Sequence, residues 1–268
     1  MKKFLSAALI TAGLVTLSSA DFLSISAGAG YEQQNISGYV KLNNTVNYFN
    51  NSSAETDGNI NTGNFGLEDE KNPYVWIKLI HPLPIVPDIK LQYTKYDSTG
   101  HSNHIAGNVE IFGDVSIPTV LTNATTTQTI DSYDLTLFYE FKPVVADIEA
   151  GVGVDYWRGH TKIYGTSGGV SKTWVDNDWK VALPYLYAHV ETMKIFGISV
   201  IGNIKWAKAG DNHHYDYIGA IKYTFDVLGP VNPFVKVGYR YKEAYGVDGD
   251  NETLLKYKGA FLEIGAKF

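Results

Sequence analysis

Acidic and imidazole side chains cluster near residue 211, and residues of these types can bind a metal ion. The cluster consists of Asp211, His213, His214 and Asp216. Imidazole nitrogens and carboxylate oxygens are suitable ligands for divalent metals. A solvated polar loop explains the same residues without any chemistry, and we favour that interpretation over a metal site.

A second candidate, Gly165-Thr166-Ser167-Gly168-Gly169, has the G-x-S-x-G spacing of a nucleophile elbow. That motif requires a tight turn from a strand into a helix, with a histidine and an acid nearby. No helical pattern follows this glycine-rich segment, so we interpret it as a flexible loop.

A third candidate is the alternating acidic run Asp248, Asp250 and Glu252, which could hold Ca²⁺. It lacks the complete oxygen-ligand pattern of a known calcium loop, and a solvated turn explains it better. We therefore predict no catalytic residue, no cofactor and no metal site, and we expect that the chain is not an enzyme.

The elements that must position these residues are strands, because apolar and polar residues alternate with period two from residue 22 onward. One face of each segment is apolar, and the other carries glycine, hydroxyl groups and charges. The first segment could run on to Tyr39, and the facing of the sixth is ambiguous. The ten predicted strands lie near residues 22–31, 73–81, 89–94, 133–141, 148–156, 180–192, 198–206, 217–225, 235–242 and 255–268.

Long and short connections alternate along the chain. Outer-membrane barrels show the same arrangement, with long extracellular loops and short periplasmic turns. We expect long loops through residue 69, at 97–131 and at 158–178, and shorter ones around 211–214 and 246–252. Residues 109–120 could extend the flanking strands beyond the membrane. An even strand number puts both termini on the periplasmic side.

The composition favours a membrane barrel over a soluble β-sandwich. The chain has 19 Tyr, 12 Phe, 5 Trp and 26 Gly, and no run of 18 apolar residues follows residue 20. Without such a run, a closed barrel is the way to satisfy backbone groups in lipid. We therefore predict an all-β, transmembrane, antiparallel up-and-down barrel. Two girdles of aromatic residues are expected at Tyr31, Tyr93, Tyr133, Phe141, Tyr156, Trp206, Tyr217 and Phe225.

Charges on the second face should point into the barrel. Buried charges must be paired or wet, and ten strands lie near the size at which side chains fill the interior. Because both signs are present, we expect a narrow or plugged lumen. The predicted interior charges are Lys90, Glu140, Glu149, Asp155, Lys205, Lys222, Lys236, Arg240, Lys242, Glu263 and Lys267.

The first twenty residues have the pattern of an export signal: Lys2 and Lys3, an apolar run, and small residues up to Ala20. Cleavage there would leave residues 21–268 as one barrel domain. Loss of the two lysines would change the formal charge from -6 to -8. An acidic balance argues against nucleic acid as a partner. The absence of cysteine excludes a lipoprotein anchor.

The last strand ends on Phe268, and Ala260, Leu262, Ile264 and Ala266 alternate before it. This end resembles the C-terminal signal of Gram-negative outer-membrane barrels, which implies the barrel assembly machinery, outer-membrane lipid and lipopolysaccharide as partners. Length and layout resemble the proteobacterial family of outer-membrane proteins with a Gly-Gly motif, for which Gly168-Gly169 is the candidate. That family implies no substrate and no catalytic residue.

Three functions follow from these expectations. The first is a non-enzymatic, porin-like outer-membrane barrel that serves small-solute permeation or envelope structure. The second is a surface adhesin or receptor that acts through its long loops. The third is a rim hydrolase similar to the omptins, which are ten-stranded barrel proteases that use Asp and His pairs. The ligand, the solute and the oligomeric state stay undefined.

Overall fold

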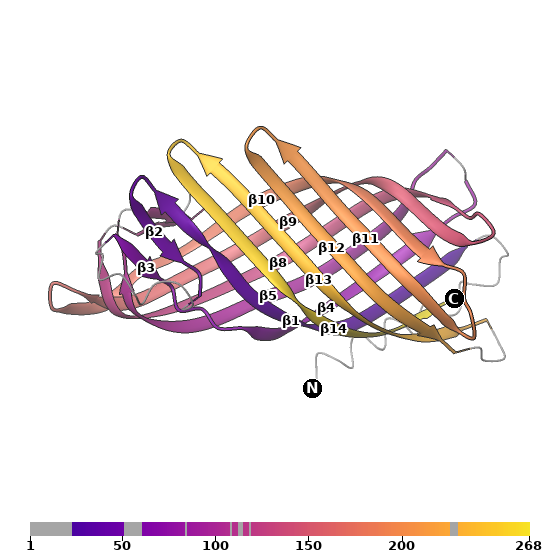
Figure 1. Cartoon of the computed structure of the whole chain (residues 1–268), viewed down its shortest axis with the longest axis horizontal. Helices are drawn as coiled ribbons and strands as arrows, with labels where there is room; N and C mark the ends of the chain where they lie inside the picture. The colour runs from indigo at the N-terminus through magenta and orange to yellow at the C-terminus, as the bar shows by residue number, and fades with distance from the viewer. Residues whose placement is uncertain are drawn as a thin grey trace.

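Ten long β-strands close into a ring in the computed structural model (Figure 1). The structure describes residues 23–50, 61–83, 85–107, 109–111, 115–117, 119–225 and 230–268, so the predicted export signal lies outside the described residues. Within these ranges no helix is long and apolar enough to cross a membrane. The ring strands are β1 (Ser24–Leu42), β4 (Glu70–Ile80), β5 (Asp88–Ile105), β8 (Leu121–Phe141), β9 (Ala146–Ser167), β10 (Val170–Thr192), β11 (Ile198–Ala209), β12 (Asn212–Thr224), β13 (Asn232–Asp248) and β14 (Asn251–Lys267).

Each ring strand pairs antiparallel with the next, and β14 pairs with β1. At this closing seam the Phe268 N–H donates to the Ile25 carbonyl at 2.7 Å, and the Ile25 N–H donates back at 3.3 Å. The apolar face of the last strand points outward, because Leu262 and Ile264 are exposed on the outside of the ring. The all-β, ten-stranded, up-and-down barrel is therefore confirmed.

The two ends of the barrel differ. We call the end at which β4 is joined to β5, β8 to β9, β10 to β11 and β12 to β13 the turn end, and the opposite end the loop end. Three predicted loops at the loop end are in fact two-residue turns, at Gly168-Gly169, Gly210-Asp211 and Gly249-Asp250. The first residue of each turn has positive φ, between 56° and 61°, which glycine adopts without a steric cost.

The predicted loop at residues 158–178 is therefore wrong, because β9 and β10 continue through it as a long hairpin. The period-two alternation persists there with its faces exchanged. Ile163, Val175 and Trp179 point inward and are buried, whereas His160 and Asp178 point outward. The hairpin extends far from the turn end, at the left of Figure 1.

The described parts of two connections at the loop end fold into the mouth of the ring. The first contains β2 (Thr45–Tyr48) and β3 (Thr62–Asn64), and the second contains β6 (Val109–Ile111) and β7 (Val115–Ile117). The expectation that residues 109–120 extend the flanking strands is wrong, since β6 and β7 pair with each other in a separate sheet. Ile111 and Ile117 are buried, which explains why this segment turns inward.

The second connection crosses the mouth. β6 contacts β1 and β14, whereas β7 contacts β10, which lies on the opposite side of the ring. The Asn251 side chain donates to the Glu110 carbonyl at 2.6 Å. Asn47 ties the two connections together, because its amide forms 2.8 Å bonds with both the N–H and the carbonyl of Ala106.

The outer surface changes polarity part-way along the strands. On β8 the outward residues near the turn end are apolar, including Leu135 and Phe141, and those near the loop end are Thr125, Thr129 and Asp131. The apolar part of the ring, here called the band, matches the lipid-facing surface of a transmembrane barrel. Six of the predicted girdle residues are exposed at the two edges of the band. The edge toward the loop end holds Tyr31, Tyr133, Trp206 and Tyr217, and the edge at the turn end holds Phe141 and Phe225.

Aromatic side chains lie over glycines across the strand pairs on the inner wall. In each case the two residues face one another directly, and a Cβ on the glycine would come within 3 Å of the ring. Because glycine has no side chain, the interior of a small barrel can accommodate large aromatic side chains at these positions. The pairs are Gly28–Trp76, Gly30–Tyr74, Gly153–Tyr185, Gly159–Trp179, Gly238–Phe261 and Gly265–Phe234.

We expect Gly159→Ala to lower the free energy of unfolding by about 1–3 kcal/mol, as overpacking does in other cores. The added methyl group would lie 1.9 Å from the buried Trp179 indole. Urea unfolding of the refolded protein in lipid vesicles measures the change. Gly219→Ala is the control, because a Cβ at this mid-strand position meets nothing within 4 Å. Equal effects of the two substitutions would contradict the packing argument.

Candidate functional site

The loop-end half of the lumen is filled by apolar side chains. They come from the ring strands and from both folded connections, and most are almost completely buried. Trp157 and Trp179 are the largest, and Tyr96 packs between the rings of Trp157 and Tyr257 at 6.1 and 4.6 Å. This loop-end core comprises Ile36, Val40, Phe49, Phe65, Leu67, Tyr96, Ile105, Ile111, Ile117, Leu121, Ala124, Ile130, Trp157, Ile163, Val175, Trp179, Ala244, Leu255 and Tyr257.

The middle of the lumen is filled by ion pairs. Arg240 binds both carboxylate oxygens of Asp216, at 2.9 and 2.6 Å, and also reaches Glu32 at 3.0 Å. All three residues are at most 3% exposed, so this triad has little access to water. A bidentate guanidinium–carboxylate pair is the geometry that best compensates for burial.

Two further pairs complete this central layer. Lys205 binds Asp134 at 2.5 Å, and Lys242 binds Asp155 at 2.6 Å. Tyrosine hydroxyls provide additional bonds, since Tyr185 donates to Asp134 at 2.7 Å. The side chains from opposite walls thus meet in the middle of the barrel.

All the predicted interior charges lie on the lumen side. Sequence reasoning missed Glu32, Lys78, Asp134, Glu191 and Asp216 as interior charges. The missed residues keep the same alternation as the predicted ones. For Asp134 and Asp216 the alternation gives the correct face, opposite Tyr133 and Tyr217, and only the set of predicted interior charges omits them.

The candidate metal cluster is not assembled. Asp211 lies in the β11–β12 turn. His213 points outward and contacts Glu243 at 2.8 Å, whereas His214 points into the lumen and contacts the Glu243 carbonyl at 3.1 Å. Asp216 binds Arg240. Among the described residues, no group of three His, Cys, Asp or Glu side chains is placed to hold a metal ion.

The other two candidates form hairpin turns. Ser167 ends β9, and Gly168 and Gly169 lead directly into β10 and not into a helix, so a nucleophile elbow does not form. Asp248 and Asp250 are exposed on either side of Gly249. Glu252 is bound by Lys41 at 3.0 Å across the closing seam, and this hydrogen bond lowers the pKa of Glu252.

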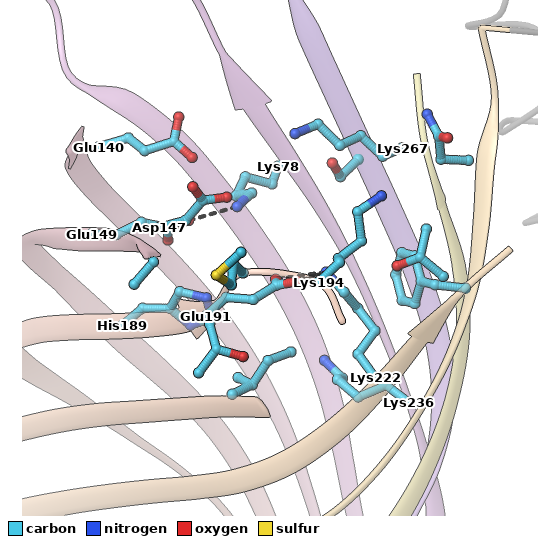
Figure 2. A pocket seen from close by; sticks show the side chains of 18 of the residues that line it. Lys78, Glu140, Asp147, Glu149, His189, Glu191, Lys194, Lys222, Lys236 and Lys267 are labelled. Atoms are coloured by element: carbon cyan, nitrogen blue, oxygen red, sulfur yellow. Dashed lines mark hydrogen bonds and ion pairs between the residues drawn. The ribbon is translucent and has the colours of Figure 1, made fainter. Parts of the chain in front are cut away.

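A cavity of about 380 Å³ lies inside the ring at the turn end, and we call it the vestibule. Figure 2 shows that its charged residues are segregated. Glu140, Asp147, Glu149 and Glu191 come from the adjacent strands β8, β9 and β10, and lysines line the other wall. The fifth carboxylate, Glu263 on β14, lies opposite Lys236 on the lysine side. The lining holds six lysines in all: Lys78, Lys90, Lys194, Lys222, Lys236 and Lys267.

Three ion pairs occupy part of the vestibule. Lys78 binds Glu149 at 2.6 Å, Lys222 binds Glu191 at 2.6 Å, and Lys236 binds Glu263 at 2.8 Å. The first of these reaches across from one wall to the other (Figure 2). The cavity is open at the turn end, where Pro143, Val144 and Met193 line it. It is the best candidate in the described residues for a binding site.

No family model and no curated protein sequence matches this chain. Its fold is similar to solved barrels at low identity. The outer membrane protease OmpT from Escherichia coli shows 8% identity and a TM-score of 0.39, covering 93% of this chain and 97% of that one. The translocator domain of the autotransporter NalP from Neisseria meningitidis shows 10% identity and a TM-score of 0.42, covering 100% and 95%. Ail, the attachment invasion locus protein of Yersinia pestis, shows 8% identity and a TM-score of 0.34, covering 93% and 100%.

These neighbours are Gram-negative outer-membrane β-barrel proteins. At such low identities the likeness concerns architecture, and no residue of this chain takes a role from any of them.

Proposed function

We propose that this chain is an integral outer-membrane barrel of a Gram-negative envelope, with a plugged lumen and no enzymatic activity. The observation that carries the proposal is the exchange of polarity along the strands. In the band the outside is apolar and the inside charged, whereas beyond it the outside is polar and the inside apolar. The first arrangement suits lipid and the second suits water.

The proposed role is in envelope structure rather than open diffusion. The loop-end core and the central ion pairs lie one after the other along the lumen, so two layers oppose a water path. In this proposal outer-membrane lipid and lipopolysaccharide surround the band, and the barrel assembly machinery inserts the chain. Membership of the Gly-Gly family also belongs to the proposal. Gly168 and Gly169, its candidate motif, form a turn in which both residues have positive φ.

We expect Leu135→Arg to lower the free energy of unfolding from lipid vesicles by about 1–3 kcal/mol, because the cost of a cation on a barrel's lipid face is largest at the bilayer centre and falls toward the edge, and Leu135 lies two residues inside Tyr133. Leu135 is 37% exposed on the outer face of β8, inside the band. Urea titration followed by gel mobility of unheated samples measures the change.

Thr129→Arg is the matched control. Thr129 lies on the same face of β8, six residues toward the loop end, and is paired with Asp97 of β5. We expect a change of less than about 1 kcal/mol there, since the depth-dependent cost vanishes outside lipid. A similar penalty at both positions would contradict the placement of the band in the membrane.

A further inference from the structure

Like-charged residues face one another on two strand pairs of the vestibule. Lys78 lies directly opposite Lys90 on β4 and β5, and Lys222 lies directly opposite Lys236 on β12 and β13. Such pairs destabilise a sheet unless something compensates for the repulsion. Carboxylates compensate Lys78, Lys222 and Lys236. Among the described residues, no carboxylate lies within ion-pair distance of Lys90.

The Lys90 ammonium instead lies near an aromatic ring. Its Nζ is 5.4 Å from the centre of the Trp76 ring, and the Nζ of Lys236 is 5.6 Å from the same ring. Cation–π contact attracts both ammonium groups to the indole but leaves their net charge in place. The ring therefore lies between Lys236, which Glu263 compensates, and Lys90, which has no carboxylate partner among the described residues.

The wall around these cations also contains an unused hydrogen-bond donor. Trp76 Nε1 is buried and makes no hydrogen bond with any described group. Lys267 lines the same cavity and has no ion pair with a described residue, and the Ser26 hydroxyl lies there too. An uncompensated charge and an unsatisfied donor are both costly in a confined space. The first of these costs falls when a small anion with several oxygens enters the cavity.

We propose that the vestibule binds an oxyanion, a phosphate or carboxylate group, with the Lys90 ammonium as its main partner and Lys236, Lys267 and the Trp76 wall around it. The vestibule has space for such a group, and its opening at the turn end gives access from the periplasm. The binding site goes beyond the proposed structural role. It also does not depend on that role, because binding is measured on the folded barrel in detergent.

The test is calorimetric titration of the folded protein, at constant ionic strength, with inorganic phosphate and, in a second arm, with short-chain phosphatidic acid. Tighter binding of phosphate assigns the oxyanion to a free solute, and tighter binding of the lipid assigns it to a headgroup. We expect Lys90→Met to weaken binding of the preferred probe about tenfold or more, as loss of a charge-assisted bond does. Lys90→Arg should retain binding within a few-fold.

Lys258→Met is the control, because Lys258 is exposed on β14 outside the vestibule. We expect its affinity to equal that of the wild type. Lys267→Met provides a second test if Lys90→Met does not fold, and it too should weaken binding several-fold. The proposal is overturned if neither probe binds the wild type at millimolar concentration, or if the vestibule variants bind as tightly as Lys258→Met.

Discussion

Replacing Arg240 with methionine lowers the free energy of unfolding by about 3–5 kcal/mol, the range found when one partner of a buried ion pair is removed. Arg240 holds two carboxylates at once, with Nε and Nη2 on Asp216 and Nη1 on Glu32. Both acids are at most 1% exposed. Without the guanidinium the two carboxylates would repel one another at a site where both are almost completely buried. Urea unfolding in vesicles measures the loss.

The chain contains a matched control, since its second arginine, Arg158, is exposed on the outside of β9 beyond the band. Arg158→Met should change stability by less than about 1 kcal/mol, as exposed charges usually do. Adding Glu32→Gln and Asp216→Asn to Arg240→Met should restore part of the lost stability, because the stranded charges are then gone. If the triple variant is no more stable than Arg240→Met, the loss has a cause other than charge burial.

The strand number and the facing of most strands could be predicted from the sequence because lipid imposes a simple rule on the band. Every second residue there must be apolar, as at Leu262 and Ile264 of the closing strand. The facing of β10 was ambiguous for a physical reason. Tyr185 points inward and covers Gly153 on the neighbouring strand, so both faces of β10 are rich in apolar residues.

The lengths of the loop-end hairpins could not be predicted, because the same rule reverses outside the band. Beyond Tyr156 on β9, the outward residues become Arg158, His160 and Lys162, and Trp157 becomes part of the core. A search for membrane strands ends at this reversal and assigns the rest to a loop. The two-residue turn at Gly168-Gly169 shows that pairing continues to the tip.

The candidate site was only partly predictable. Alternation alone places Lys90, Glu149 and Lys236 in the lumen. The partners depend on the register and on the diameter of the ring. Lys78 reaches Glu149, 71 residues later in the sequence, across the vestibule. The like-charged Lys78–Lys90 pair likewise follows from the register of β4 with β5, which periodicity does not specify.

The second large effect concerns conduction. We expect the refolded barrel to show no stable conductance steps in a planar bilayer, although ten-stranded rings have space for a narrow water path if their interiors are sparsely filled. In the proposed plugged barrel, two consecutive layers close the lumen. The loop-end core excludes water with rings such as Trp157 and Trp179, and the central layer holds Lys205 and Lys242 in direct ion pairs.

Single-channel recording of the full-length protein therefore tests the plugged barrel most directly. The recording needs an open porin in the same bilayer as a positive control, and heat-modifiable gel mobility to show that the sample is folded. The plugged barrel predicts a silent baseline over the voltage range at which the porin conducts. Reproducible, stable steps of porin size from the folded protein would contradict it.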